Sequence, residues 1–446
     1  MLKLSLKIAA FALVLWKFGP VEAKLFNASA YQLDNGMQVV VVPNHKAPIV
    51  KHMVWYKVGS ADEKPGKGGI AHLLEHLMFR GTKKIKGTEL NRITENNGME
   101  ANAFTGQDYT AYHQLTDVSK LELAMFMEAD RMSNLNFSDE DFGLERDIVY
   151  QERKQVVENN PVSVFSETLR KVMWQDHPYA RPVTGSVKEI MTLTPEDARS
   201  FYRRYYAPNN AILVLSGDIE PETGLRLAKK YYGSAKKSDV SVVPALDKAE
   251  GNFSAAFEME LPAVASMRLS NVWLAPSVNS EDRKDIYALS VLSKYLGEGK
   301  TSKLYKKLVD GNKKALAAES SYDYAVRGDG TFTISAIPRE GVSAEEMQQA
   351  LGQAVKEALD EITLDEIAMT KHRMLAGLVY LKDNPGDAAM IIGSMMSSGM
   401  SLDDIEALAD SIAAVEYKDV KAAGEKLLLQ KPRVMAVIKP KPEEKR

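Results

Sequence analysis

The sequence has no cysteine, seven histidines and four tryptophans among its 446 residues. Without cysteine no disulfide can form, and any metal site must be built from histidine and carboxylate ligands. The 57 basic and 60 acidic residues give a formal net charge of −3, so the basic excess typical of nucleic-acid-binding proteins is missing. Apolar residues make up 45%, an ordinary share for a globular protein, and the length predicts two or more domains.

The first 23 residues differ in character from the rest. Lys3 and Lys7 accompany an apolar run over 8–16, and residues 21–23 end in a small residue. This order is typical of a secretory signal peptide. The alternative is a membrane anchor, but the run stops at Lys17, far short of the ~20 residues that a helical span needs. We therefore expect a signal peptide at 1–23, no integral membrane span in the mature form, and a periplasmic or secreted protein, with the lack of disulfides favouring a bacterial periplasm.

The hydrophobic pattern predicts an α+β fold with the same order of elements in two halves. Residues 236–251 lack periodicity and are interpreted as a linker between an N-terminal domain at 24–235 and a C-terminal domain at 252–446. The similar layout indicates an internal duplication. Predicted strands lie at 31–42 around an Asn-Gly turn, 50–58, 100–104, 110–115, 211–216, 266–274, 331–337 and 434–438, and predicted helices at 70–80, 121–132, 138–158, 221–232, 281–296 and 343–362.

The most informative stretch is the predicted helix at 70–80, which carries His72, Glu75 and His76. Two histidines four residues apart lie on one helix face, where both imidazoles can reach one zinc ion at ~2.0–2.1 Å. Glu75 lies about 100° around the helix from His76, so it can stand beside the metal and take a proton from water there. The spacing His-x-x-Glu-His is the inverse of the commoner zinc-peptidase motif.

The alternative interpretation is a partly buried helix that carries these residues by chance, since a short motif alone is only a hypothesis. However, two of only seven histidines fall at this spacing, on a helix that is otherwise apolar. Burying two imidazoles and a carboxylate without partners would be costly. The metal interpretation is therefore favoured, with one zinc per chain.

A catalytic zinc usually has three protein ligands, and the third must come from another segment. The helix at 138–158, which starts with a capping-box pattern at Ser138 and Asp141, carries Glu145, Glu152 and Glu158. Glu145 and Glu152 are seven residues apart and share one face. Spacing alone does not choose among the three, and a solvated acidic face is the plainer alternative.

The chain resembles the family of zinc endopeptidases that includes pitrilysin, insulin-degrading enzyme and mitochondrial processing peptidase. The resemblance covers most of 29–235 and continues weakly through the second half. It is carried by Leu33–Gly36 with the following valines, Gly68–Thr82, Asn102–Thr105 with Asp108 and Tyr112, Glu145–Asp147 with Glu152, His177–Gly185, and Tyr206–Asp218.

This resemblance implies two similar halves, each a mixed, mostly antiparallel sheet packed with helices, that form a clamshell around a chamber. It implies that Glu152, 76 positions after His76, is the third zinc ligand, and that Glu145 supports the site from behind the ligands. It further implies that Glu100–Phe104 is an edge strand to which a peptide substrate adds, with Asn102 and Ala103 as contacts. The C-terminal half would bind no metal.

One departure from the family concerns the second half. Active single-chain members carry an arginine and a tyrosine there, just after a segment like Thr301–Tyr305. Here the corresponding positions are Val309 and Ala317, and Tyr322 and Tyr324 do not fit the register. Some members divide the site between two homologous subunits, so we expect this chain to be the zinc subunit of a heterodimer whose partner supplies the Arg/Tyr pair. A homodimer or a monomer with other substrate-binding groups is the alternative.

Three functions compete on this basis. The first is a periplasmic zinc endopeptidase acting on extended peptides or small unfolded proteins. The second is a non-catalytic, structural or chaperone-like subunit of a peptidase complex, although loss of the base Glu75 would then be tolerated and it is present. The third is a zinc hydrolase of another class, such as a deaminase or amidase, which would need a different ligand set.

Overall fold

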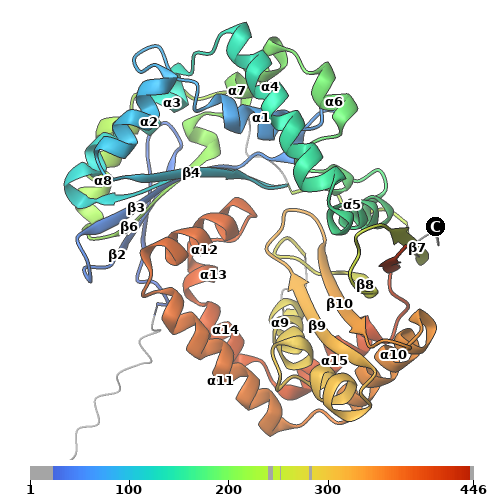
Figure 1. The fold of residues 1–446 in the computed structure, drawn as a ribbon. Helices are drawn as coiled ribbons and strands as arrows, with labels where there is room; N and C mark the ends of the chain where they lie inside the picture. The colour runs from blue at the N-terminus through green and yellow to red at the C-terminus, as the bar shows by residue number, and fades with distance from the viewer. Residues whose placement is uncertain (1–23, 240–244, 252, 281–283, 442–446) are drawn as a thin grey trace, which may run out of the picture.

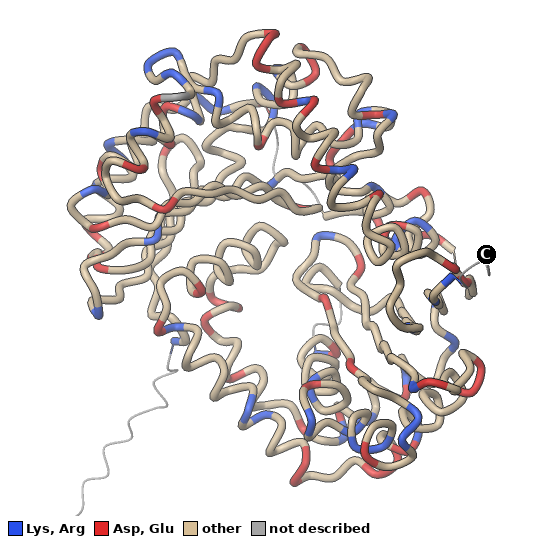
Figure 2. Tube along the Cα trace, viewed as in Figure 1, with Lys and Arg blue, Asp and Glu red and all other residues tan. Residues whose placement is uncertain are grey.

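A computed structural model describes residues 24–239, 245–251, 253–280 and 284–441. The signal peptide expected at 1–23 lies outside the described residues, as does the 240–244 part of the expected linker. Among the described helices, none combines the length and the apolar character that a membrane crossing requires. In the view of Figure 2, acidic and basic residues are interspersed along the outer helices of both halves.

The first sheet has six strands in the order β1-β2-β6-β3-β5-β4. All neighbouring pairs are antiparallel except β2 and β6, so the sheet is mixed and mostly antiparallel as expected. Its strands are β1 (Ser29–Gln32), β2 (Gln38–Pro43), β3 (Ile49–Tyr56), β4 (Glu100–Thr105), β5 (Thr110–Asp117) and β6 (Ala211–Gly217). Strand β4 ends this order and pairs only with β5 among the described strands.

The helices of the N-terminal half lie mainly on one face of this sheet (Figure 1). They bury an apolar layer that includes Val41, Val54 and Leu213 from the sheet. The helices are α1 (Ile70–Leu77), α2 (Gly87–Asn96), α3 (Leu121–Asn134), α4 (Asp139–Arg153), α5 (Pro161–Trp174), α6 (Val187–Thr192), α7 (Pro195–Tyr205) and α8 (Pro221–Tyr232), with short turns η1 (Ser60–Asp62), η2 (Val118–Lys120), η3 (Lys154–Glu158), η4 (Pro178–Ala180) and η5 (Pro208–Asn210).

The second sheet repeats five strands of the first in order and direction. Its order β7-β11-β8-β10-β9 corresponds to β2-β6-β3-β5-β4, and again only the first pair is parallel. This repeat confirms the expected α+β fold of two similar halves. The strands are β7 (Ala255–Leu261), β8 (Arg268–Ala275), β9 (Ala315–Asp323), β10 (Gly330–Pro338) and β11 (Val434–Pro440).

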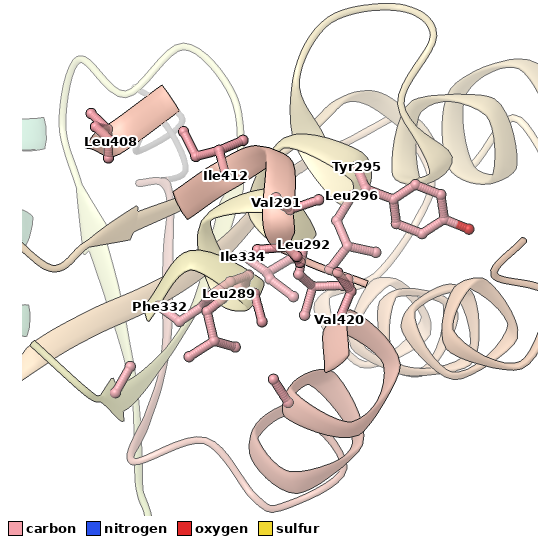
Figure 3. Close-up of a cluster of buried hydrophobic side chains, with 14 of the residues drawn as sticks. Leu289, Val291, Leu292, Tyr295, Leu296, Phe332, Ile334, Leu408, Ile412 and Val420 are labelled. Carbon is pink, nitrogen blue, oxygen red and sulfur yellow. The ribbon is translucent and has the colours of Figure 1, made fainter. Parts of the chain in front are cut away.

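In the C-terminal half, helix α9 occupies the place between its strands that α1 occupies in the N-terminal half. Its buried side chains pack against Phe332 and Ile334 of β10 and against later helices (Figure 3). The helical segments of this half are α9 (Lys284–Gly297), η6 (Tyr305–Gly311), α10 (Ala344–Asp360), α11 (Leu364–Leu381), α12 (Pro385–Ser397), α13 (Leu402–Glu406), α14 (Leu408–Ala414) and α15 (Tyr417–Leu428).

Each half supplies one helix to the sheet of the other half. Helix α12 lies on the face of the first sheet opposite α1 (Figure 1), where Gly393 packs so closely on Trp55 that a Cβ atom would stand 2.0 Å from the indole ring. In return, α5 packs against β7 and β11, with the rings of Phe165 and Phe257 5.8 Å apart. Because both faces of the first sheet are buried, β3 has apolar residues on both sides. The domain boundaries expected at 235 and 252 remain a prediction.

The two halves also meet through equivalent hairpin turns. Residues 106–109 join β4 to β5, and residues 324–329 join β9 to β10. The Asp108 carboxylate accepts hydrogen bonds from the backbone N–H of Arg327 at 3.0 Å and from the Tyr179 hydroxyl at 2.6 Å. The Arg327 guanidinium, 4% exposed, forms a two-pronged ion pair with Asp62 at 2.8 and 3.0 Å. These contacts place a buried polar junction beside the segment that leads into α1.

Candidate metal centre

Helix α1 is amphipathic, and its two sides have different surroundings. Leu73, Leu74 and Leu77 are fully buried in the core between the sheet and the helices. Gly69 precedes the helix with φ of +87°, a conformation that glycine adopts without strain. The opposite side of the helix carries the polar residues of the motif, whose imidazole rings stand 4.9 Å apart at nearly right angles. The buried leucines therefore fix the direction in which both rings point.

The structure brings Glu152 of α4 to both histidines of α1. Its Oε2 atom lies 3.8 Å from Nε2 of His72 and 3.4 Å from Nε2 of His76. Helix α4 changes to the wider π-helical winding of η3 immediately after Arg153. Such π-helical turns are often found at functional sites. Within the described part of the chain, these three residues form the one cluster of histidine and carboxylate groups arranged to hold a metal ion.

The donor set and spacing fit zinc. Around a tetrahedral zinc with bonds of ~2.0–2.2 Å, two ligand atoms lie about 3.3–3.6 Å apart, close to the distances observed here. Burial, with the charge of His76 as a smaller cause, lowers the pKa of His72 to about 4. The His72 ring is therefore neutral near pH 7, the form that binds a metal. Its Nδ1 atom is buried and has no hydrogen-bond partner in the described structure, so Nε2, which faces Glu152, is the ring nitrogen available to a metal.

Glu145 lies behind His76 and is not part of the three-residue cluster. Its Oε2 atom is 3.0 Å from Nδ1 of His76, and its Oε1 atom accepts a 2.5 Å hydrogen bond from Nε of Arg80. Burial alone would raise the pKa of Glu145, but the hydrogen bonds from His76 and Arg80 outweigh it and lower that pKa. For His76, burial is outweighed by the hydrogen bond and charge of Glu145, which raise its pKa. A carboxylate in this position fixes the ring so that Nε2 faces Glu152.

Glu75 lies beside the three-residue cluster and touches the edge strand. Its Oε2 atom accepts a 2.5 Å hydrogen bond from the hydroxyl of Thr105, the last residue of β4. Burial raises the pKa of Glu75, although the Thr105 hydrogen bond opposes that shift. A carboxylate with a raised pKa is a better proton acceptor near neutral pH. The geometry therefore joins the helix of the motif to the end of β4.

Asn102 and Ala103 lie on β4, at the outer edge of the first sheet. They pair with His113 and Tyr112 of β5. The side-chain oxygen of Asn102 accepts a 2.8 Å hydrogen bond from the backbone N–H of Ala103. That N–H is therefore not used within the sheet, and the amide side chain covers an edge group that another strand could use.

The second-half residues considered for the Arg/Tyr pair are built into the helices and strands of that half. Val309 lies in η6, 7% exposed, in the core of the C-terminal half. Ala317 lies on β9 opposite Ile337 of β10. The hydroxyl of Tyr322 donates to the backbone carbonyl of Pro276. None of these three side chains presents a cation or an unengaged hydroxyl.

Three residues at this centre were missed by sequence reasoning. Arg80 lies three residues beyond the end of α1, although the helix predicted at 70–80 would have placed it four residues after His76 and on the same side. Thr105 lies one residue beyond the strand predicted at 100–104, and its approach to Glu75 depends on how β4 packs on α1. Glu63 accepts hydrogen bonds from the backbone at the start of α1, and nothing in its local sequence marks that role.

Comparison with known sequences places this arrangement among peptidases. Residues 38–187 match the profile of insulinase, peptidase family M16, and residues 192–374 match that of the M16 inactive domain. Zinc protease PqqE of Helicobacter pylori is 32% identical over 387 residues, which cover 85% of this chain and 84% of that protein. The chain belongs to peptidase family M16. This confirms the resemblance drawn from the motif region.

Other M16 relatives extend the similarity. An uncharacterized zinc protease of Streptomyces coelicolor is 26% identical, with 91% of this chain and 88% of that protein covered. The crystal structure of a protease from Helicobacter pylori superposes with a TM-score of 0.85 at 28% identity, covering 93% of this chain and 99% of that one. An M16 inactive domain from Pseudomonas fluorescens, with a TM-score of 0.82 at 19% identity and coverage of 94% and 99%, shares the fold. The family and its zinc proteases support peptidase activity.

Proposed function

We propose that this chain is a zinc-dependent endopeptidase that hydrolyses peptide bonds in extended peptides or small unfolded proteins. The observation that carries the proposal is the convergence of His72, His76 and Glu152 with Glu75 beside them. A deaminase or amidase is disfavoured because the family and the edge strand beside Glu75 both suit peptide substrates. Zinc would be held by the two Nε2 atoms and Oε2.

Zinc bound there would supply Lewis-acid polarisation of the scissile carbonyl and a lower pKa for water at the site. Glu75 accepts the proton of the attacking water and then delivers it to the leaving amine nitrogen. Thr105 fixes one oxygen of the Glu75 carboxylate, which leaves the other to exchange the proton. Glu145 and Arg80 hold the His76 ring in one orientation throughout.

The substrate segment is proposed to add to β4 as an extra strand. Such pairing selects an extended backbone without selecting particular side chains. An incoming carbonyl would take the N–H of Ala103 from the side chain of Asn102. Because Thr105 of the same strand bonds to Glu75, a peptide aligned on β4 would run past the catalytic carboxylate.

We further propose that the chain acts as the zinc subunit of a heterodimer, in a bacterial periplasm. The partner proposal rests on Val309, which is buried in the core and offers no charge to a substrate, and on Ala317, which has no hydroxyl. A homologous partner would then supply the Arg/Tyr pair. The location rests on the signal-peptide pattern of residues 1–23.

The test of the catalytic proposal is Glu75→Gln, with exposed Glu140→Gln on α4 as the matched control. Hydrolysis of an unfolded peptide and bound zinc are measured for both variants, in the presence of candidate homologous partners. We expect Glu75→Gln to keep one zinc per chain and to lose at least about 10²–10³-fold in kcat, while the control retains activity. Unchanged hydrolysis by Glu75→Gln would remove Glu75 as the base.

The partner proposal is tested by assaying the chain alone and mixed with a homologue that carries the Arg/Tyr pair. Activity that appears chiefly on mixing supports the divided site. Full activity of the chain alone overturns the partner proposal and leaves the metal assignment in place. Bound zinc without activity in either case favours the non-catalytic, structural or chaperone-like subunit.

A further inference from the structure

Helix α1 begins without a cap from its own sequence. The residue at the N-cap position is Gly69, which has no side chain, and the first turn is buried. The first backbone N–H groups of a helix have no acceptor within the helix. They need acceptors from elsewhere when they are buried, because burying them unpaired is costly. Here the acceptor is Glu63, whose two carboxylate oxygens each lie 3.0 Å from a backbone nitrogen, Oε2 from that of Gly69 and Oε1 from that of Ala71.

Glu63 is 3% exposed and reaches α1 from outside the helix. Because it accepts hydrogen bonds from the backbone of Gly69 and Ala71, it fixes the position of the chain immediately before His72. His72 is only the third residue of the helix, so a displacement of the first turn displaces its imidazole ring by a similar distance. Displacements of about 1 Å at supporting positions can cost a catalytic site a large factor in rate.

The segment that carries Glu63 is fixed in turn by neighbours from both halves. Within the N-terminal half, the backbone of η1 bonds to the β4–β5 turn, with Ser60 N–H to the carbonyl of Gly106 and Ala61 N–H to that of Gln107. From the C-terminal half, Arg327 forms its two-pronged ion pair with Asp62, the residue immediately before Glu63. The Arg327 backbone is itself anchored on Asp108.

We propose that Glu63 is a positioning residue of the metal centre and that Arg327 of the C-terminal half, acting through Asp62, holds it in place. The equivalent hairpin turns of the two halves thereby brace the start of the metal-binding helix. The C-terminal half, which supplies none of the three clustered groups, then contributes to their geometry. This inference rests on the proposed zinc site for its measurements.

The experiment compares zinc affinity, by competition with a chromophoric chelator, and the visible spectrum of the cobalt-substituted full chain. The variants are Glu63→Gln, Glu63→Ala, Asp62→Asn, Arg327→Lys and the double variant of the last two. Asp383→Asn is the matched control, since Asp383 also forms an ion pair between halves, with Lys46 at 2.5 Å, but on the α11–α12 loop.

We expect Glu63→Ala to weaken zinc binding by about tenfold or more and to alter the cobalt spectrum. Glu63→Gln keeps one oxygen acceptor but turns its NH2 group toward the other backbone N–H, so it should weaken zinc binding severalfold, less than Glu63→Ala does. Asp62→Asn and Arg327→Lys should each weaken binding severalfold, and their effects should not add, because both break the same ion pair. Asp383→Asn should leave affinity and spectrum unchanged.

The proposal is overturned if the Glu63 and Arg327 variants lower the melting temperature but keep wild-type zinc affinity and cobalt spectrum. If Glu63→Ala does not fold, the Glu63→Gln, Asp62→Asn and Arg327→Lys variants decide by the same measurements. Failure of the unmodified chain to bind zinc would instead overturn the proposed function. The two failures are therefore distinguished by the wild-type measurement.

Discussion

Helices α1 and α9 occupy equivalent places in the two halves but are used differently. Helix α1 follows β3 and α9 follows the equivalent strand β8, and each precedes an edge strand, β4 or β9. Helix α1 presents His72 and His76 toward α4 and Glu75 toward the end of β4. Helix α9 has no histidine and buries Leu289, Leu292 and other apolar residues against β10, α14 and α15 (Figure 3).

The difference teaches how this scaffold accommodates a polar helix: two of the three polar side chains of the α1 motif have partners on neighbouring elements, whereas Nδ1 of His72 has none among the described residues. On α1, His76 is paired with Glu145, and Glu75 with Thr105. Unpaired groups of this kind would cost several kcal/mol if buried. Helix α9 has no such requirement because its side chains fill a core. One copy of the duplicated unit therefore presents a cluster of polar groups, and the equivalent helix of the other copy fills an apolar core.

The largest expected difference between α1 and α9 is the response to removal of the metal. When zinc is stripped with a chelator, we expect peptide hydrolysis to fall to background, while far-ultraviolet circular dichroism is retained because the leucines of α1 stay buried. The melting temperature should fall, since a ligand that binds only the folded state stabilises it. Adding zinc back should restore both. Activity that persists without bound metal would contradict the assignment of α1.

The converse change is Leu292→Ala in α9. Leu292 is fully buried, so we expect a loss of about 2–5 kcal/mol in the free energy of unfolding, measured with urea. Zinc stoichiometry of the folded fraction should not change. Leu292→Met, which conserves volume, is the matched control and should cost less than about 1.5 kcal/mol. A loss of zinc binding without a loss of stability would show that α9 has more than a packing role.

A smaller effect, on zinc affinity, is expected from Glu145, which contacts His76. Glu145→Gln keeps the shape of the side chain but removes the charge beside His76 and Arg80. We expect zinc affinity to fall by about 10–100-fold, as is usual for partners behind metal ligands. Chelator competition measures this, with Glu140→Gln on the same helix as the control. Equal affinities for the two variants would mean that Glu145 does not orient His76.

Much of this site could be predicted from local sequence, because helical spacing alone places His72 and His76 on one face. The choice of Glu152 over Glu145 and Glu158 came only from the family resemblance. Which of three acids on α4 reaches α1 depends on how two helices cross, and spacing along one helix does not contain that angle. The structure places Glu152 at the histidines and Glu145 behind them.

The fold class and most strands also followed from the hydrophobic pattern, but β7 and β9 were missed. Both are edge strands, and five of the nine residues of β9 are alanine or serine, which give a weak strand signal. The exchange of α5 and α12 between the halves was also beyond prediction. Residue 393 must be glycine there because a Cβ atom would clash with Trp55. The hydrophobic pattern does not show that these two segments, far apart in the sequence, are in contact.

The smallest expected effect concerns the junction where the two halves meet. Burial raises the pKa of Asp108, although its hydrogen bonds from Tyr179 and Arg327 oppose the shift, and the nearby Asp62 adds to it. A carboxyl group with a raised pKa in the folded state holds its proton more tightly there than in the unfolded chain. Its contribution to stability is therefore present at low pH and is lost as pH rises through the folded-state pKa.

Asp108→Asn removes this titration, so we expect the wild type to lose stability relative to the variant as pH rises from about 4 to 7. Urea unfolding across that range measures the difference. Asp197→Asn is the control of opposite sign: burial opposes the shift, but bonds from Lys67 and Thr194 lower the pKa of Asp197, so its contribution is lost as pH falls. If the Asp108 difference is flat or follows the Asp197 sign, the junction favours the ionised carboxylate, and the turns of the two halves are joined by charge rather than by neutral hydrogen bonds.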